Sequence, residues 1–458
     1  MKALVPFLAM IATSFGAYAG PSDLSAYFSK DFLIKKADTG CMPKGMKADK
    51  TGDFLYVAEM CGKIDPAKNK RVPTASVFDL KKQTLVKTLV TPAGPTDGIF
   101  ANTEVDISID GKFAFISRAE GGKTAEVFKN GGLLSVVNTE TQNVVKYIPT
   151  KGEGSKIIAS RPLVAERPLE QILYVANYFS DDISVIDVTN LKDDGNLDGS
   201  RHLVKKIRLQ TRFTNPSIKK YLIAPRGITF TPDGKYALIL ATETGSLIIV
   251  DALNHQQIAE ISPIEDSTAG RPLNLRHVVV TKNGRLAYFS HMRGNAVSRI
   301  DMEKLMEEIA KVAATSMTPV LPSSVWNRLF VPFNTPKGLK KILILEDYPL
   351  DHPNFPGKKW DLAHPNTIVL DPLENRYLFV SSRTTSYKDD SKVDPRIKGK
   401  IDIIDTRNGK TVFTLVGGAQ PTALEVSPDG STLISAGLKD DKVYFYDISK
   451  IISLYQRW

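Results

Sequence analysis

Cationic and imidazole side chains recur near the start of repeated segments in this chain, and they are the residues best suited to bind a ligand. Arginine guanidinium groups pair with carboxylate and phosphate groups, and clustered cations attract anions. For any single arginine, a structural contact with a neighbouring carboxylate or carbonyl is the competing interpretation, so the cluster carries the argument. The predicted ligand-binding residues are Lys44, Glu104, Arg161, Arg226, Arg276, His277, His364 and Asn366.

A metal or cofactor site is the alternative chemistry. The sequence contains no CxxCH, GxSxG, HExxH or phosphate-loop motif, so no catalytic residue is assigned and no cofactor is predicted. Two or three histidines could instead converge on a metal ion or a non-covalent tetrapyrrole. The candidates among the six histidines are His277, His291, His352 and His364.

The two cysteines predict a disulfide. Cys41 stands just before one strand-like run and Cys61 just after the next, with a turn near Lys50 and Thr51 between them. Antiparallel pairing of the two runs places the cysteines nearly opposite each other, within bonding distance. A reduced pair or a metal site is the alternative.

These residues are positioned by a repeated unit of about 40 residues, the length typical of propeller blades. Each unit has strand-like runs separated by a tight Asp-Gly or Asn-Gly turn, and its third strand usually ends in Asp. Seven such units predict an all-β, seven-bladed propeller. The last unit lacks a clear fourth strand, and residues 32–35 could supply it and close the ring. The units span residues 42–90, 99–149, 160–209, 225–261, 273–309, 364–416 and 420–447.

The best-formed units resemble the YVTN repeat of bacterial and archaeal propellers. The resemblance lies in LYVAN and ISVID (173–177 and 183–187), PRGITFTPDGKYALI (225–239) and QPTALEVSPDGSTLISAG (420–437), and it covers roughly residues 41–455. That group includes lactonase-like propellers, which use an acid- and amide-rich metal site in the channel, and the propeller domain of cytochrome cd1-type proteins, which holds a tetrapyrrole. The resemblance to the lactonase-like propellers implies that Glu104, Asp106 and Asn366 could contribute to such a site, although the positive charge around them opposes a divalent cation. The resemblance implies the fold, whereas its matching turn and core residues imply little about function.

The longest insertion, residues 310–360, is expected at the face of the ring where each first strand starts, defined here as the top. A helix is expected over residues 305–314, within and just before it. The insertion is interpreted either as a cap that packs its own aromatic side chains or as a lid or partner platform over the channel mouth. The aromatic residues assigned to the lid are Trp326, Phe333, Tyr348 and Trp360.

The N-terminus and the charge balance place the protein outside the cytoplasm and favour an anionic partner. Residues 1–19 read as a signal peptide with a small-x-small cleavage site at Ala17-Tyr18-Ala19, and no later run is apolar enough to span a bilayer. Residues 20–40 then form an N-terminal segment ahead of a propeller at 41–458. The formal charge of +10 is spread along the chain, which disfavours nucleic acid.

The sequence therefore predicts a monomeric, periplasmic or secreted binding protein. It is expected to hold an anionic ligand or a partner protein at its top face. An enzyme or a cofactor carrier, either a lactonase-like metal-dependent hydrolase or a tetrapyrrole-handling propeller, is the alternative.

Overall fold

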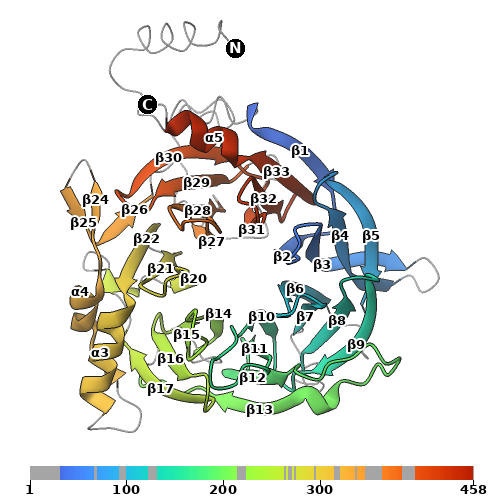
Figure 1. The fold of residues 1–458 in the computed structure, drawn as a ribbon, viewed down its shortest axis with the longest axis horizontal. Helices are drawn as coiled ribbons and strands as arrows, with labels where there is room; N and C mark the ends of the chain where they lie inside the picture. The colour runs from blue at the N-terminus through green and yellow to red at the C-terminus, as the bar shows by residue number, and fades with distance from the viewer. Residues whose placement is uncertain are drawn as a thin grey trace, which may run out of the picture.

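The strands form seven blades around a central channel, which confirms the all-β propeller (Figure 1). The predicted signal peptide lies outside the residues that the structure describes. No helix among the described residues has the length and apolar character needed to cross a membrane. The computed structural model describes residues 31–65, 70–91, 99–121, 131–213, 223–262, 265–266, 271–272, 275–292, 295–313, 320–335, 338–345, 364–383 and 398–456.

Blades 1 to 3 are consecutive stretches of chain whose strands run in order from the channel outward. Blade 3 begins earlier than predicted, because its innermost strand precedes the predicted boundary at Ser160 instead of following it. The strands are β2 (Pro43–Ala48), β3 (Phe54–Asp65), β4 (Lys70–Asp79), β5 (Thr84–Val90), β6 (Ile99–Ile107), β7 (Phe113–Gly121), β8 (Leu133–Asn138), β9 (Asn143–Pro149), β10 (Ser155–Ser160), β11 (Ile172–Asn177), β12 (Asp182–Asp187) and β13 (Leu203–Arg208), with the short helix η3 (Ser200–His202) before β13.

Blades 4 to 6 follow the same order, but the outer strand of blade 5 comes from within the long insertion. Tight turns join the inner strands, as at Gly234, whose φ of 68° suits glycine. The strands are β14 (Pro225–Phe230), β15 (Tyr236–Ala241), β16 (Leu247–Asp251), β17 (Gln256–Ile261), β20 (Leu275–Val280), β21 (Leu286–His291), β22 (Ala296–Asp301), β26 (Ile342–Ile344), β27 (Pro365–Leu370), β28 (Tyr377–Ser382), β29 (Lys400–Asp405) and β30 (Lys410–Val416), with the short pair β18 (Glu265–Asp266) and β19 (Arg271–Pro272) after blade 4.

The N-terminal strand closes the ring. Blade 7 is built from β31 (Pro421–Val426), β32 (Thr432–Gly437) and β33 (Lys442–Asp447), and the helix α5 (Ile448–Tyr455) follows. Its outer strand is β1 (Leu33–Asp38), which pairs antiparallel with β33 from Leu33 opposite Tyr446 to Asp38 opposite Lys442. The expected closure by residues 32–35 is thus seen, and it covers an edge of β33 that would otherwise be open to pairing.

The hydrophobic core lies between neighbouring blades, and the hairpin with the YVTN resemblance shows why its strands are apolar throughout. Successive side chains of a strand point to opposite faces of the sheet. In β11, Leu173 and Val175 pack toward blade 2, whereas Tyr174 and Ala176 pack toward blade 4. The Tyr174 ring meets the ring of Phe230 on β14 edge-on at 4.9 Å. A strand covered on both faces has no solvent side to mark with polar residues.

The predicted disulfide between Cys41 and Cys61 is confirmed. The Cα atoms of the two residues are 5.3 Å apart, and the bond encloses 20 residues of sequence. The Cys61 backbone N–H also donates to the Cys41 carbonyl across the ends of the first hairpin. The disulfide thus secures the approach to β2, the innermost strand of blade 1.

The long insertion starts with the third-to-fourth strand connection of blade 5. After β22 the chain forms a helix, wraps along the outer edge of blades 4 and 5, and returns as β26 beside β22 (Figure 1). A third strand ends at the bottom of the ring, and the described elements of the insertion lie along its outer edge and not over the top mouth as predicted. The insertion's elements are α3 (Met302–Ala313), β23 (Val320–Leu321), η4 (Ser323–Val325), α4 (Trp326–Leu329), β24 (Phe333–Thr335) and β25 (Gly338–Lys340).

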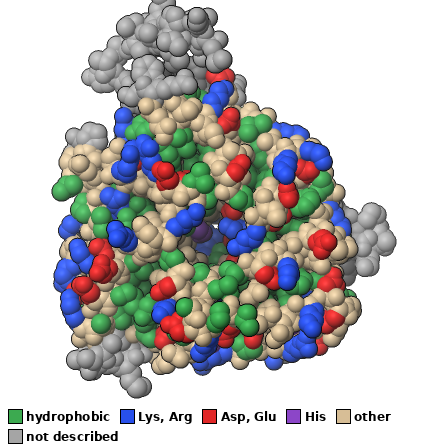
Figure 2. Space-filling view, viewed as in Figure 1, with side chains coloured by type: hydrophobic (Ala, Val, Ile, Leu, Met, Phe, Trp, Pro, Cys, Tyr) green, Lys and Arg blue, Asp and Glu red, His purple; other side chains and the backbone are tan. Residues whose placement is uncertain are grey.

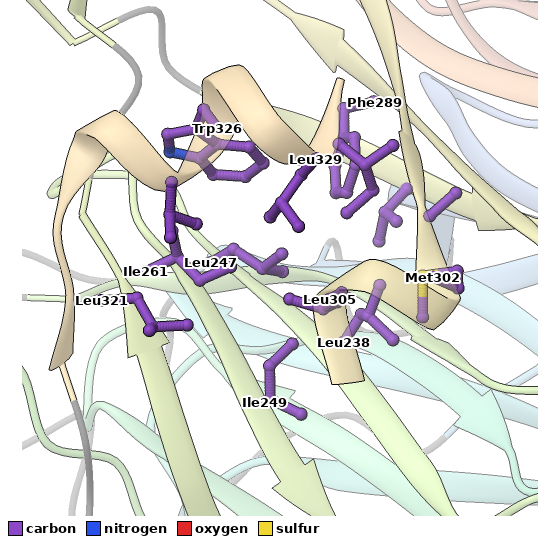
Figure 3. Packing of buried hydrophobic residues seen from close by; sticks show 14 of the residues in the cluster. Leu238, Leu247, Ile249, Ile261, Phe289, Met302, Leu305, Leu321, Trp326 and Leu329 are labelled. Atoms are coloured by element: carbon purple, nitrogen blue, oxygen red, sulfur yellow. The ribbon is translucent and has the colours of Figure 1, made fainter. Parts of the chain in front are cut away.

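The described aromatic residues of the insertion pack inward. Trp326 is 2% exposed and lies against Leu329 and the side chains of blades 4 and 5 (Figure 3), and its indole N–H donates to the Ser262 carbonyl at 2.7 Å. Phe333 is fully buried, with the Arg299 guanidinium 4.4 Å from its ring centre. The lid assignment of Trp326 and Phe333 is therefore corrected to a packing role. Tyr348 and Trp360 lie outside the described residues.

Candidate functional site

The top mouth of the channel holds a cavity of about 310 Å³ with a strongly cationic lining. Of its described lining residues, six are Lys or Arg and none is Asp or Glu. The channel passes through the ring, and on the face drawn in Figure 2 Lys and Arg side chains lie beside its central opening and a histidine lies inside it. We call the six residues the mouth cations: Lys44, Lys156, Arg226, Arg276, Arg383 and Lys439.

A β-bulge at the start of each innermost strand turns these side chains toward the channel. The pairing register between the first and second strands shifts in all seven blades, and a bulge re-aims the side chain of the extra residue. Lys44 lies in the bulge of β2, Lys156 in that of β10, Arg226 in that of β14 and Arg276 in that of β20. Four of the six mouth cations therefore converge because equivalent positions of the repeat share one backbone irregularity, whereas Arg383 and Lys439 follow second strands.

Neighbouring side chains hold several mouth cations in place. The Arg276 Nε donates to Asn366 Oδ1 at 3.2 Å, and Asn366 is anchored in turn by donating from Nδ2 to the Thr422 carbonyl at 2.7 Å. The Arg383 guanidinium donates to Gln420 Oε1 at 3.0 Å. These contacts orient guanidinium groups before any ligand arrives, which lowers the entropy lost on binding.

Lys156 is held by an aromatic pair at the rim. Its ammonium lies 3.6 Å from the centre of the Tyr178 ring and 4.9 Å from that of Phe179, distances at which the ring faces attract a cation. Tyr178 is fixed by donating its hydroxyl to Glu243 at 2.9 Å. The rim between blades 3 and 4 is thereby linked to the mouth.

The mouth cations destabilise one another's charge. Burial, followed by the nearby Arg226, Arg383 and Arg276, holds the pKa of Lys44 well below its ordinary value. Burial, followed by Arg226 and Arg276, does the same to the pKa of Lys156. Crowded like charges in a partly desolvated site make an anion a favourable occupant.

The channel continues below the mouth into a second cavity of about 280 Å³ with mixed charge. Glu104 and His277 line it, and burial raises the pKa of Glu104 to about 8 despite Lys44 and Arg226 nearby. Burial and Arg226 lower the pKa of His277 to about 4. Further down, Lys47 pairs with Glu425 at 3.1 Å. The excess of positive charge therefore belongs to the mouth and not to the whole channel.

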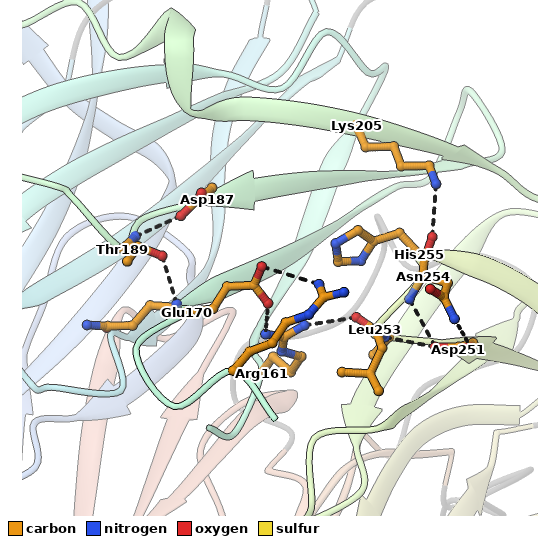
Figure 4. A network of polar contacts seen from close by, with 12 residues as sticks. Arg161, Glu170, Asp187, Thr189, Lys205, Asp251, Leu253, Asn254 and His255 are labelled. Atoms are coloured by element: carbon orange, nitrogen blue, oxygen red, sulfur yellow. Dashed lines mark hydrogen bonds and ion pairs between the residues drawn. The ribbon is translucent and has the colours of Figure 1, made fainter. Parts of the chain in front are cut away.

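Arg161 does not reach the mouth. It follows β10, at the bottom end of that strand, where its fully buried guanidinium donates to the Ala252 carbonyl at 2.9 Å and pairs with Glu170 (Figure 4). The predicted ligand-binding role is corrected to a structural one, which joins blade 3 to blade 4. The error arose from starting the third repeat at Ser160, one strand too late, and the equivalent mouth residue is Lys156.

Two other residues predicted to bind the ligand, Asn366 and His364, are not among the described lining residues of the mouth. Asn366 supports Arg276, and His364 is a buried residue (7% exposed) that precedes β27 and is not among the mouth's lining residues. His291 is buried and bonds Ser298 at 2.6 Å. His352 lies outside the described residues. Within the part of the chain that is described, no three His, Cys, Asp or Glu side chains gather as a metal site would require.

Lys156, Arg383 and Lys439 were missed from the sequence. Arg383 and Lys439 each follow the second strand of a blade, in FVSSR and SAGLK, so they occupy top-face connections. Comparing the residues that follow each second strand would have found both. Lys156 required the true start of β10, which its sequence SKIIAS marks less clearly than the PRG or PTA openings of other blades.

Comparisons with known proteins support the fold and leave the family open. No protein-family model matches the chain. Among curated proteins, Antigen Lp49 of Leptospira interrogans is 23% identical over 286 residues, which is 61% of this chain and 46% of that protein. The chain thus spans about half the length of the curated relative it matches.

The chain also resembles solved structures of different proteins. The β-propeller domain of Cps50 (Swd1) from Myceliophthora thermophila has a TM-score of 0.54 at 12% identity, covering 91% of this chain and 99% of that one. Hydrazine synthase of Kuenenia stuttgartiensis has a TM-score of 0.54 at 15% identity, covering 94% and 99%. At these identities the likeness shows the fold alone.

Proposed function

We propose that this protein is an exported binding protein that holds a small anionic ligand in the top mouth of its channel. The observation that carries the proposal is the group of six mouth cations around a cavity of about 310 Å³. Arginine and lysine bind carboxylate and phosphate through charge-assisted hydrogen bonds, and clefts of one sign concentrate ions of the other. The same charge opposes a divalent cation, so the anion proposal is preferred to a metal-dependent hydrolase.

The size and position of the cavity favour a small molecule. Ligand sites in proteins usually measure about 300–1,000 Å³, and this cavity lies at the lower end of that range. A folded partner would contact the rim instead of entering the mouth. The disulfide between Cys41 and Cys61 is consistent with an oxidising compartment such as the periplasm or the extracellular space.

The test is calorimetric titration with a panel of carboxylates, phosphates and sulfate at low ionic strength. We expect at least one anion to bind with one site per chain. The double variant Arg226→Gln/Arg276→Gln should weaken that binding at least tenfold. Arg208→Gln is the matched control, because Arg208 is exposed on the outer strand β13 and carries the same charge away from the channel. No binding by any anion, or an equal loss in the control, would overturn the proposal.

A further inference from the structure

The mouth cations are distributed around the channel axis and not gathered on one side. Blades 1, 3, 4 and 5 supply Lys44, Lys156, Arg226 and Arg276 from their innermost strands. Blades 6 and 7 supply Arg383 and Lys439 from the connections after their second strands. Among the described lining residues, blade 2 supplies Thr103 and no cation. A ligand in the cavity is therefore surrounded by cations on nearly all sides.

This arrangement discriminates between anions by the number and spacing of their charges. A single carboxylate or phosphate group is contacted by one or two arginine forks, and it leaves the remaining like charges facing one another. A compact molecule with anionic groups on different sides contacts cations of several blades at once. Its binding therefore relieves repulsion across the channel as well as forming hydrogen bonds.

Charge and volume limit such a ligand in opposite ways. Six cations favour several anionic groups, whereas a cavity of about 310 Å³ favours a compact molecule over a large one. The contacts of Arg276 with Asn366 and of Arg383 with Gln420 fix two of the forks in different blades. Two fixed forks select the spacing between anionic groups as well as their charge.

We infer that the ligand is a compact polyanion with at least two separate carboxylate or phosphate groups held by cations of different blades. This inference rests on the proposed anion-binding function. The low pKa of Lys44 and of Lys156, caused by burial and the neighbouring arginines, adds an independent signature. A bound polyanion stabilises their charged forms, so binding takes up protons from the solution.

The test compares polyanions with monoanions of the same chemistry at constant ionic strength. Citrate is compared with acetate, and pyrophosphate with dimethyl phosphate. We expect at least one of the two polyanions to bind at least a hundredfold more tightly than its monoanionic counterpart. Whether that polyanion is citrate or pyrophosphate identifies the ligand groups as carboxylates or phosphates. Titration in two buffers of different ionisation enthalpy should show net proton uptake.

Single variants in different blades provide the structural arm. Lys44→Gln and Arg226→Gln lie in blades 1 and 4, and each should weaken polyanion binding at least tenfold, while Arg208→Gln should leave it unchanged. Circular dichroism checks that each variant is folded.

The possible outcomes distinguish the inference of a polyanionic ligand from the anion-binding function on which it rests. Monoanions that bind as tightly as polyanions, or a loss confined to one of the two blades, would overturn the inference and leave the anion-binding function standing. Failure of every anion to bind would overturn both.

Discussion

Two regions of the molecule use arginine in different ways. At the bottom of blade 3, Arg161 is enclosed with a carboxylate from Glu170 and a carbonyl from Ala252, so its charge is matched where it lies. At the top mouth, six cations line one cavity and the described lining offers no carboxylate. The first arrangement joins two blades. The second brings six cations to one cavity, where a bound anion would contact several of them.

The difference teaches that residue type and place in the repeat do not settle an arginine's role. Arg161 and Arg226 both lie near the start of a predicted repeat, and both precede or begin an apolar run. Their roles diverge because one follows an innermost strand and the other occupies the bulge that opens one. The predictions below test this division between structural and ligand-binding cations.

The largest expected effect is on stability at the matched site. Arg161→Ala removes the buried partner of Glu170 and one donor to Ala252, and it should lower the free energy of unfolding by about 3 kcal/mol. Urea unfolding measures this loss. Anion affinity under native conditions should not change, and a weakened affinity in a folded Arg161 variant would contradict the division.

The next largest effect is on anion affinity at the mouth, without a loss of stability. Arg276→Gln removes a cation from a crowded group, so anion affinity should fall at least tenfold, or about 1.4 kcal/mol, while stability to urea stays the same or rises. Calorimetry and unfolding on the same preparation measure both quantities. A large loss of stability with unchanged affinity would mean that Arg276, like Arg161, is a structural residue.

A smaller effect is expected from pH. Glu104 is faced by Lys44 and Arg226 and by Asp106 of its own strand, and burial raises its pKa to about 8. Between pH 7 and pH 9 Glu104 gains negative charge. The lowered pKa values of Lys44 and Lys156 mean that these lysines lose positive charge at a lower pH than an ordinary lysine does. Both changes oppose an anion, so affinity should fall as pH rises. Sulfate is the suitable probe because it stays a dianion throughout.

Glu104→Gln provides the control for this pH dependence. Removing the ionisable carboxyl should reduce the decrease in sulfate affinity with rising pH. The decrease that remains is due to the lysines. An affinity for sulfate that is constant or rises from pH 7 to pH 9 would contradict the proposed charge balance of the mouth.

The smallest effect concerns the insertion. Trp326→Phe keeps an aromatic ring but removes the hydrogen bond to the Ser262 carbonyl, which should cost about 1 kcal/mol of stability. Association and dissociation rates of the anion should not change, since Trp326 packs at the outer edge of the ring. Altered rates, measured by stopped flow, would reinstate a lid function for this segment.

Much of the fold was predictable because its signals are local. Turns such as Pro232-Asp233-Gly234 and apolar runs such as LYVAN specify each blade within a few residues of sequence, and seven repetitions specify the ring. The closing strand β1 could be expected because the last unit was short of a strand. The outer strand of blade 5 could not, since β26 has three residues and lies far along the chain from β22.

The mouth was predictable only in part, because some of its features are local in sequence and others are not. Lys44, Arg226 and Arg276 could be selected because the opening of a strand is a local feature. The sequence alone thus determined the blades, their number and the presence of cations where strands open. The tertiary structure decided which cations meet, because bulges aim four of them and closure brings six distant segments to one axis. It also gave Arg161 a carbonyl partner 91 residues away, a pairing that no local pattern encodes.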